Sequence, residues 1–157
     1  MPDNSQLNLA SWKGKVVVLE FLLTTCPACQ RCAQAMNKIQ AEYGKKGVQV
    51  IGIAVDDPGA KTNAVSFVSR FGLGFPVGYL TGDKPRDFLQ IPSIVRFMLP
   101  QVVFIDRQGT IVAQHNPSSP FFANEEKYAR EQLDKLLAAP AGGAAKKAPA
   151  KSGAKKK

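Results

Sequence analysis

LEFLLTTCPACQRCAQAM, residues 19–36, places three cysteines at three-residue intervals directly after an apolar run. The whole run, GKVVVLEFLL at residues 14–23, is rich in Val and Leu, which is typical of a strand buried on both faces of a sheet. From Pro27 the apolar residues recur at three- and four-residue steps as far as Gly44, which predicts an amphipathic helix. We therefore expect a buried strand that leads directly into a helix, with the cysteines at the junction.

The same strand and helix pattern occurs again further along the chain. VQVIGIAVDD, residues 48–57, resembles a second buried strand, and residues 60–71 return to helical spacing. A right-handed crossover makes two such strands parallel neighbours in one sheet. Residues 100–115 contain two strand-like runs joined by a Gly-containing turn at residues 106–109, and residues 125–137 form an amphipathic pattern. The sequence therefore predicts an α/β fold with a central mixed sheet flanked by helices.

The inner faces of the two later helices follow from the same spacing. In each helix the apolar side chains that recur at three- and four-residue steps are expected to face the sheet. These side chains are Ala64, Val65, Phe67, Val68, Phe71, Tyr128, Leu133, Leu136 and Leu137.

Length and charge favour a single domain followed by a tail. At 157 residues the chain fits one domain with a full core. Residues 141–157 hold six lysines and no acid, which leaves 15 basic and 12 acidic residues elsewhere, a net charge of +3. That remainder has no basic stripe interleaved with aromatic residues, so specific nucleic-acid binding is not expected. We predict a domain over residues 1–139 and a disordered, basic Ala/Lys/Pro-rich tail over residues 140–157.

Cysteine usage and the N-terminus bear on the compartment. All three cysteines fall within seven residues, so they mark a local site and cannot form a framework of distant disulfides. The sequence has no apolar run of about 18 residues, and its first residues lack the basic-then-apolar order of a signal peptide. We expect either a cytoplasmic protein or an extracytoplasmic one whose leader was removed.

Cys26 stands where a helix is expected to begin. A cysteine there faces unpaired backbone N–H groups and the positive end of the helix dipole, which favour thiolate over thiol. Pro27 suits the first helical turn, because its missing N–H costs little at that position. Cys29 follows one turn later, close enough to bond Cys26. A Cys-x-x-Cys spacing beside a βαβ pattern indicates thiol–disulfide exchange, in which Cys26 attacks a disulfide and Cys29 resolves the mixed disulfide.

The segment LNLASWKGKVVVLEFLLTTCPACQRC, residues 7–32, resembles the opening of a thioredoxin-like thiol–disulfide oxidoreductase of the extracytoplasmic TlpA and ResA type. The similarity continues through GVQVIGIAVDD, FGLGFPVGY and LPQVVFIDRQGTIV. It implies a thioredoxin-like fold without a cofactor, with Cys26 as nucleophile and Cys29 as resolving cysteine. It also implies disulfide-containing protein substrates, apocytochrome c among them, and a thiol electron donor. The implied location is extracytoplasmic, with membrane association through a removed N-terminal anchor, and we expect a monomer.

The same resemblance implies a substrate groove beside the cysteines. Pro100 matches the cis-proline of the family, which faces the two cysteines, and Leu99 is the residue before it. The backbone of Leu99 would pair with an extended segment of the substrate. Thr25 and Pro27 would flank the nucleophile on the other side of this groove.

Glu20 is an acidic residue inside the first apolar run, six residues before Cys26. In the thioredoxin family a buried acid at this position lies under the disulfide and relays protons for the resolving cysteine. Burial would raise its pKa and make it a general acid or base near neutral pH. The alternative is a surface acid on an edge strand, which the apolar neighbours on both sides disfavour.

Three positions depart from the pattern of the family. Thr25 stands where members usually have Trp, and Gln34 stands where a helix-kinking proline is common, so a straighter helix is expected. Cys32 stands where the TlpA and ResA group often places a glutamate. Cys32 has two open interpretations: a small buried hydrophobic residue, or an accessory thiol that competes for Cys29 or protects the centre under oxidation.

Two other classes of function remain as alternatives. Three thiolates could bind a metal, but the chain has no fourth cysteine, and we expect its one histidine, His115, to be solvated at a strand end. Sco-type copper chaperones use a wider C-x-x-x-C and a histidine before the later strand pair, where Met98 is the nearby residue here. Peroxiredoxins need a threonine at the position of Leu23. We therefore expect thiol–disulfide exchange without a metal, and only the resemblance favours reduction over oxidation.

Overall fold

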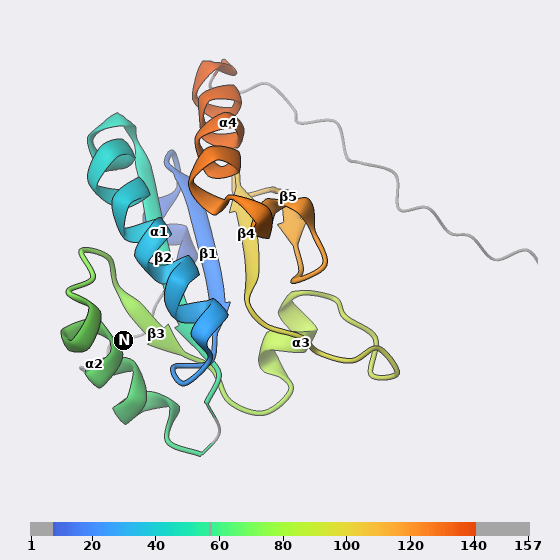
Figure 1. Ribbon diagram of the computed structural model, residues 1–157. Coiled ribbons are helices and arrows are strands. Elements are labelled where there is room, and N and C mark those ends of the chain that lie inside the picture. The colour runs from blue at the N-terminus through green and yellow to red at the C-terminus, as the bar shows by residue number, and fades with distance from the viewer. Residues whose placement is uncertain (1–7, 57, 141–157) are drawn as a thin grey trace, which may run out of the picture.

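A computed structural model describes residues 8–56 and 58–140 of the chain (Figure 1). Five strands form one sheet in the order β3-β2-β1-β4-β5. Strands β1 and β2 are parallel, as are β2 and β3, whereas β4 is antiparallel to both β1 and β5. The predicted α/β fold with a central mixed sheet is confirmed. In chain order the elements are η1 (Leu9–Trp12), β1 (Val16–Leu22), α1 (Pro27–Tyr43), η2 (Gly44–Lys46), β2 (Val48–Ala54), α2 (Ala60–Phe71), β3 (Val77–Tyr79), α3 (Lys84–Phe88), β4 (Gln101–Ile105), β5 (Ile111–His115), η3 (Pro120–Ala123) and α4 (Glu125–Ala138).

The predicted tail lies almost wholly outside the described residues. Pro140 is described and exposed, just beyond the end of α4, and residues 141–157 are not described. Within the described ranges, no helix combines the length and the apolar character that crossing a membrane requires.

Strand β1 is the centre of the core, because all seven of its residues are buried. Its side chains alternate between the two faces of the sheet. One face packs against α1, α2 and α4 and includes Val16, Val18 and Leu22. The opposite face packs against η1 and the segment around α3, and includes Val17, Leu19 and Phe21. A continuous apolar run is what a strand covered on both faces requires, and Figure 1 shows α1 and α4 side by side over one of those faces.

The strand directions bring three loops to one edge of the sheet. Because β1 and β2 are parallel, the loops that follow them leave at the same edge, where α1 also begins. Strand β4 is antiparallel to β1, and Gln101 at its start pairs with Phe21 near the end of β1. The loop before β4 therefore arrives at the same edge as the start of α1.

Helix α1 is uninterrupted over its 17 residues, as expected for a helix with Gln34 in place of a proline. It ends before Gly44 as predicted, but Gly44 itself is right-handed, with φ −54° and ψ −43°. The chain continues through the short turn η2 to Gly47, whose φ of 92° is left-handed. Gly47 is therefore the residue that ends the helical segment, because a residue without a Cβ adopts this φ at little cost.

The predicted inner face of α2 is partly wrong, because Val65 is 44% exposed. The buried residues of α2 are Ala60, Ala64 and Phe67, a stripe with four- and three-residue steps that does not include Val65. In α4 the residues that are fully buried are Ala129 and Leu133, whereas Tyr128, Leu136 and Leu137 are only partly buried. In both helices, fewer of the apolar side chains are fully buried than their spacing in the sequence predicted.

The packing of α1 on the sheet can be tested with one pair of identical substitutions. Ile39 is fully buried in α1, whereas Ile94 is 94% exposed in the loop before β4. We expect Ile39→Ala to lower the free energy of unfolding by about 2 to 5 kcal/mol, because it removes buried methyl groups and leaves a cavity. Ile94→Ala should change it by less than about 0.5 kcal/mol. Urea denaturation measures both, and equal effects would contradict this packing.

Candidate active site

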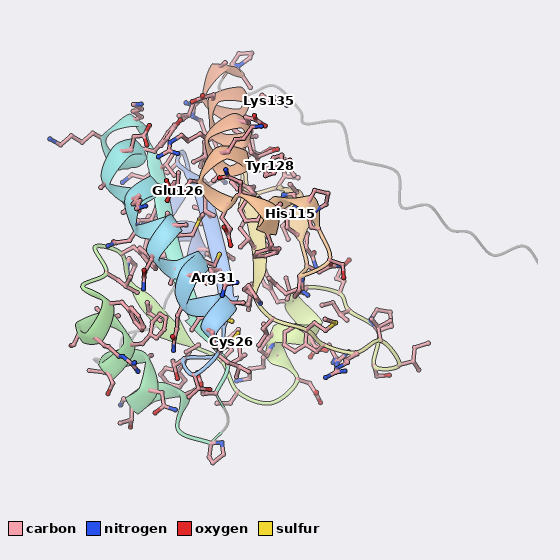
Figure 2. The ribbon with its side chains drawn as sticks, viewed as in Figure 1. Cys26, Arg31, His115, Glu126, Tyr128 and Lys135 are labelled. Carbon is pink, nitrogen blue, oxygen red and sulfur yellow. The ribbon has the colours of Figure 1, made fainter. Side chains whose placement is uncertain are left out.

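Cys26 is the N-cap residue of α1 and directly precedes the helix. It has extended backbone dihedrals, φ −81° and ψ 119°, and its Sγ accepts a hydrogen bond from the backbone N–H of Cys29 at 3.3 Å. Pro27 occupies the first helical turn, as predicted. Cys26 is partly exposed, and Figure 2 shows it at the end of α1 that faces the loops of this sheet edge. A partner could therefore approach its sulfur from solvent.

Cys29 lies one turn further along α1 and is fully buried. Cys26, Cys29 and Cys32 are all free thiols in this structure. Burial, together with the neighbouring Cys26, raises the pKa of Cys29 well above that of an ordinary thiol. The pair is therefore asymmetric, with an accessible sulfur on Cys26 and a protonated, enclosed sulfur on Cys29.

Glu20 is fully buried in the central strand, so the alternative of a surface acid on an edge strand is wrong. It pairs with Gly52 of β2 and Val102 of β4 and shares a face of the sheet with the residues that contact α1. Neither carboxylate oxygen has a hydrogen-bond partner in the part of the chain that the structure describes. Burial raises the pKa of Glu20 well above its ordinary value, and the negative charges of Cys26 and Glu125 add to this effect.

Cys32 lies one turn beyond Cys29 and is also fully buried. Cys32 lowers the pKa of Glu20, although neither oxygen of that acid has a hydrogen-bond partner among the described residues. Burial and the charge of Glu20 in turn raise the pKa of Cys32 well above that of an ordinary thiol. Cys32 is therefore enclosed and protonated.

Asp56 is a residue of this edge that the sequence analysis missed. It follows β2, and its carboxylate accepts hydrogen bonds from the backbone N–H of Thr24 at 2.9 and 3.1 Å and from the Thr24 hydroxyl at 2.8 Å. Gln30 donates to the carbonyl of Thr24 at 2.9 Å, so the turn before Cys26 is held from two sides. The sequence could have indicated this contact, because Thr24 and Asp56 each follow one of two strands predicted to be parallel, and the ends of neighbouring parallel strands lie close together.

Pro100 and Leu99 lie on the loop that arrives at the same edge. The Leu99–Pro100 peptide bond is cis, Pro100 is buried, and Leu99 packs against the same apolar cluster as Cys26. The buried side chain of Gln101 donates a hydrogen bond to the carbonyl of Met98 at 3.0 Å, which holds this loop against β4. The structure therefore places the loop of Leu99 and Pro100 at the same end of the sheet as the start of α1.

Exposed residues lie next to Cys26 along the chain and in the loop before β4. Thr25 and Pro27 are exposed beside Cys26. In the loop before β4 the exposed fractions are 94% for Ile94 and 43% for Met98. The loop before β4 therefore presents apolar side chains to solvent.

His115 is not the solvated histidine that the sequence predicted. It is half-buried at the end of β5, with Nδ1 at 2.9 Å from the hydroxyl of Ser119 and its ring stacked on Phe121 at 4.7 Å. Burial lowers the pKa of His115. Figure 2 shows it well away from Cys26. Among the described residues, no group of three or more His, Cys, Asp or Glu side chains is arranged to hold a metal ion.

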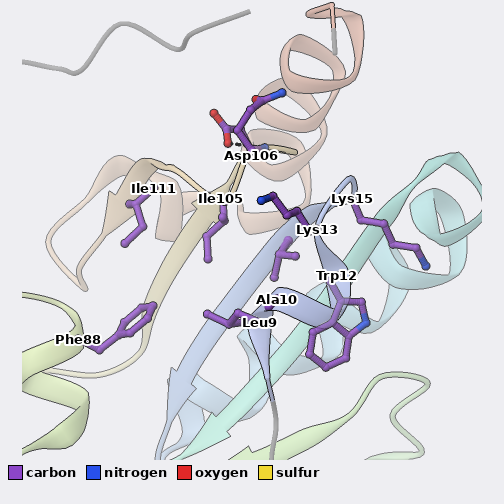
Figure 3. Close-up of a pocket in the computed structure, with 12 residues that line it drawn as sticks. Leu9, Ala10, Trp12, Lys13, Lys15, Phe88, Ile105, Asp106 and Ile111 are labelled. Atoms are coloured by element: carbon purple, nitrogen blue, oxygen red, sulfur yellow. Dashed lines mark hydrogen bonds between the residues drawn. The ribbon is translucent and has the colours of Figure 1, made fainter. Parts of the chain in front are cut away.

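A separate pocket of about 310 Å³ lies at the other end of β1 and on the face opposite α1. Leu9, Phe88 and Ile105 surround this hollow (Figure 3). None of the residues predicted for the redox site lines it. The cysteine pair and its groove are therefore a different part of the surface.

A pair of cysteines lies at the N-terminal end of a helix, and a loop with a cis-proline lies at the same end of the sheet. Together with a mixed sheet of the order β3-β2-β1-β4-β5, these features define a protein of the thioredoxin-fold class. A candidate thiol:disulfide interchange protein DsbE from Chlorobium tepidum superposes with a TM-score of 0.69 at 25% identity, over 82% of this chain and 84% of that chain. A secreted disulfide oxidoreductase from Mycobacterium tuberculosis has the same fold, with a TM-score of 0.62 at 23% identity over 87% of this chain and 90% of that chain.

The chain belongs to the Redoxin family, whose model matches residues 1–133. It is 32% identical over 113 residues to the thiol-disulfide oxidoreductase ResA of Halalkalibacterium halodurans, which is 72% of this chain and 60% of that protein. It is also 32% identical over 109 residues to ResA of Geobacillus thermodenitrificans, covering 69% of this chain and 59% of that protein. The chain thus spans less than two thirds of the length of these two relatives.

The bracing of the active-site turn can be tested at Asp56. We expect Asp56→Ala to lower the free energy of unfolding by about 1 to 3 kcal/mol, because it leaves the N–H and hydroxyl of Thr24 without partners. Thr24→Val should have a smaller effect, since it removes only the hydroxyl. Urea denaturation compares both with Asp87→Ala, a change at an exposed acid. Equal stability of Asp56→Ala and Asp87→Ala would contradict the bracing.

The burial of Glu20 predicts a stability that depends on pH. Because folding raises its pKa, its contribution to stability is retained below the ordinary value of 4.5 and is lost as pH rises through the folded-state pKa. Glu20→Leu should therefore raise the free energy of unfolding by about 1 to 3 kcal/mol at about pH 8, and by less at about pH 5. Urea denaturation at the two pH values measures the difference, and a gain that does not grow with pH would contradict an ionisable buried acid.

Proposed function

We propose that the protein is a thiol–disulfide oxidoreductase that reduces disulfides of proteins through Cys26 and Cys29. The observation that carries this proposal is the asymmetric pair, in which an accessible Cys26 caps the start of α1 and a buried Cys29 donates its backbone N–H to the sulfur of Cys26. Membership of the Redoxin family and similarity to two ResA oxidoreductases support the same chemistry.

The first step of the proposed reaction takes place at Cys26. Its thiolate attacks one sulfur of a substrate disulfide, so that a new S–S bond joins Cys26 to the substrate and the original S–S bond breaks. The sulfur that leaves takes a proton from solvent. The N–H of Cys29, which already donates to the sulfur of Cys26, favours the negative charge before attack.

The second step takes place at Cys29 and needs a base. The carboxylate of Glu20 accepts the thiol proton of Cys29, and the resulting thiolate attacks the sulfur of Cys26. The second substrate sulfur leaves and is protonated by solvent, so two electrons pass from the cysteine pair to the substrate. A raised pKa makes Glu20 a stronger base than an ordinary carboxylate. When a thiol donor reduces the pair again, protonated Glu20 returns the proton to Cys29.

The proposed substrate site is the groove between the start of α1 and the loop before β4. The backbone of Leu99 would pair with an extended segment of the substrate, Pro100 would shape the floor, and Thr25 and Pro27 would contact the opposite side. The apolar side chains of Ile94 and Met98 favour an unfolded or extended protein segment over a small polar disulfide.

We also propose that the reaction takes place outside the cytoplasm. Disulfides persist in oxidising compartments, and a fold relative from Mycobacterium tuberculosis is described as secreted. The partners in this proposal are disulfide-containing proteins, apocytochrome c among them, and a thiol donor that reduces the Cys26 and Cys29 pair again, with no cofactor. We propose that the protein acts as a monomer, associated with the membrane through an N-terminal anchor.

The two cysteines should respond differently to substitution. We expect Cys26→Ser to abolish reduction of a scrambled or oxidised protein substrate, because it removes the attacking sulfur. Cys29→Ser should instead accumulate a mixed disulfide with the substrate, because nothing resolves it. Non-reducing electrophoresis and mass spectrometry detect this adduct. An adduct on Cys29 in the Cys26→Ser variant would reverse the assigned roles.

Equilibration with glutathione tests the direction of exchange. A reduction potential of the Cys26 and Cys29 pair of about −250 mV or lower supports a reductase, whereas a reduction potential of about −120 mV makes the protein an oxidant. The absence of a two-electron couple would overturn the proposed function. A rate of peroxide reduction higher than that of protein-disulfide reduction would favour a peroxidase. The threonine that peroxidases need has no counterpart here, because Leu23 occupies its position.

A further inference from the structure

The inference concerns the pocket of Figure 3, which we call the η1 pocket after the helical turn that forms one of its walls. It has a volume of about 310 Å³, and η1, β1, α3 and the β4–β5 hairpin contribute its lining. Pockets that hold small molecules have volumes of about 300 to 1,000 Å³. The η1 pocket is therefore large enough for a compact organic molecule.

The walls of the η1 pocket are apolar, and two of them are aromatic. Val17 and Ile105 pair with each other across β1 and β4 and are both buried. Leu9, Trp12 and Phe88 pack against the same apolar cluster and line the pocket. Figure 3 shows Trp12 and Phe88 on opposite sides of Leu9. Because aromatic rings offer large surfaces for stacking, these walls favour a ligand with an aromatic body.

Hydrogen bonds hold the walls of the η1 pocket in place. The backbone N–H of Gly14 donates to the carbonyl of Arg107 at 3.0 Å, which joins the segment after η1 to the β4–β5 turn. In that turn the carboxylate of Asp106 accepts the backbone N–H groups of Gln108 and Thr110, both at 2.9 Å. The pocket is therefore formed before a ligand arrives, so binding needs little reorganisation.

The charges at the η1 pocket favour an anion. Lys13 and Lys15 line it and are exposed, and neither forms an ion pair within the described part of the chain. Asp106 lines it as well, but its carboxylate is bound within the turn, and the lining retains a charge of +1. Figure 3 shows the ammonium group of Lys13 directed toward Ile105, whereas Lys15 points away. Lys13 is therefore the cation best placed to contact a ligand.

We propose that the η1 pocket binds a small aromatic anion, such as an aromatic carboxylate or sulfonate, with its ring system against Trp12 and Phe88 and its charge at Lys13. Binding is non-covalent and transfers no electrons. The site lies at the start of β1, whereas Cys26 follows the end of that strand, about 20 Å away for seven residues at about 3.3 Å each. This inference goes beyond the proposed function and does not depend on it.

The test compares two probes that differ in one charged group. Anilinonaphthalene sulfonate is an aromatic anion, and phenylnaphthylamine is the same aromatic body without the sulfonate. Trp12 is the only tryptophan of the chain, so its fluorescence reports a ligand beside η1. We expect the anionic probe to bind more tightly than the neutral probe. Amide NMR of the full chain should show shifts at Val17 and Gly109 and none at Cys29.

Removal of one charge tests the role of Lys13. We expect Lys13→Gln to weaken binding of the anionic probe by about threefold to fivefold, the range for a partly exposed ion pair, and to leave the neutral probe unchanged. Lys45→Gln is the matched control, because Lys45 is an exposed lysine of η2 that does not line the η1 pocket. It changes the net charge equally and should leave both affinities unchanged.

An added side chain tests the pocket itself. Ala10 is exposed in η1 and lines the pocket. We expect Ala10→Phe to weaken binding of both probes by at least about tenfold, because the new ring occupies the space that the probes need. Ala123→Phe, at an exposed alanine of η3, should have no effect. Urea denaturation verifies that each variant is folded.

Each outcome has one meaning for the inference. Equal affinity of the two probes, or equal losses in Lys13→Gln and Lys45→Gln, would overturn an anionic ligand. Amide shifts at Cys29 and Met98 in place of Val17 would locate the probe in the substrate groove and overturn the site. Binding that appears only after removal of residues 1–7, or only in dilute protein that has dissociated from a dimer, would assign the pocket to this chain or to a second copy.

The inference and the proposed function can fail separately. Cys26→Ser should abolish disulfide exchange and still bind the anionic probe with the affinity of the wild-type protein. Loss of probe binding in wild-type protein that exchanges disulfides normally would overturn the inference alone. Absence of a two-electron couple in wild-type protein that binds the probe would overturn the proposed function alone.

Discussion

The pairing of β1 with a parallel strand on one side and an antiparallel strand on the other positions every part of the candidate site. Parallel pairing with β2 brings the turn that ends in Cys26 beside Asp56. Antiparallel pairing with β4 returns the loop of Leu99 and Pro100 to the same edge. A shift of the β1 register by one residue would turn the side chain of Glu20 to the other face of the sheet, away from α1 and its cysteine pair. The redox chemistry therefore depends on strand pairing as much as on the cysteines.

The central strand contains a conflict between stability and chemistry. Six of its seven residues are buried apolar side chains, and the seventh is Glu20, which is buried without a partner among the described residues. Such a group destabilises the fold when it ionises, but the same burial makes it a base of suitable strength beside Cys29. A surface carboxylate would be harmless to folding and too weak a base. The local loss of stability is thus part of how the site would work.

The two loops of the site are held by side chains that have no chemical role. Asp56 receives three hydrogen bonds from Thr24, and Gln101 holds the carbonyl of Met98. Both braces are buried, and each joins a loop to a neighbouring strand or strand end. A cysteine on an unbraced loop would sample many positions, so exchange with a substrate would lose the benefit of a fixed geometry. These hydrogen bonds hold the two loops in place beside the accessible sulfur of Cys26.

The sequence by itself determined the elements whose signals are local and repeated. The apolar run of β1, the helical spacing after Pro27, the second strand and helix, and the hairpin of β4 and β5 were all predicted, as was the burial of Glu20. Only the tertiary structure decided the contacts between residues distant along the chain, such as Thr24 with Asp56. It also decided where the short elements β3 and α3 form, because elements of three and five residues are too short to show a periodic pattern. The physical reason is that periodicity reports which face of an element is buried, whereas the identity of the neighbour on that face depends on strand order and register, which no local pattern contains.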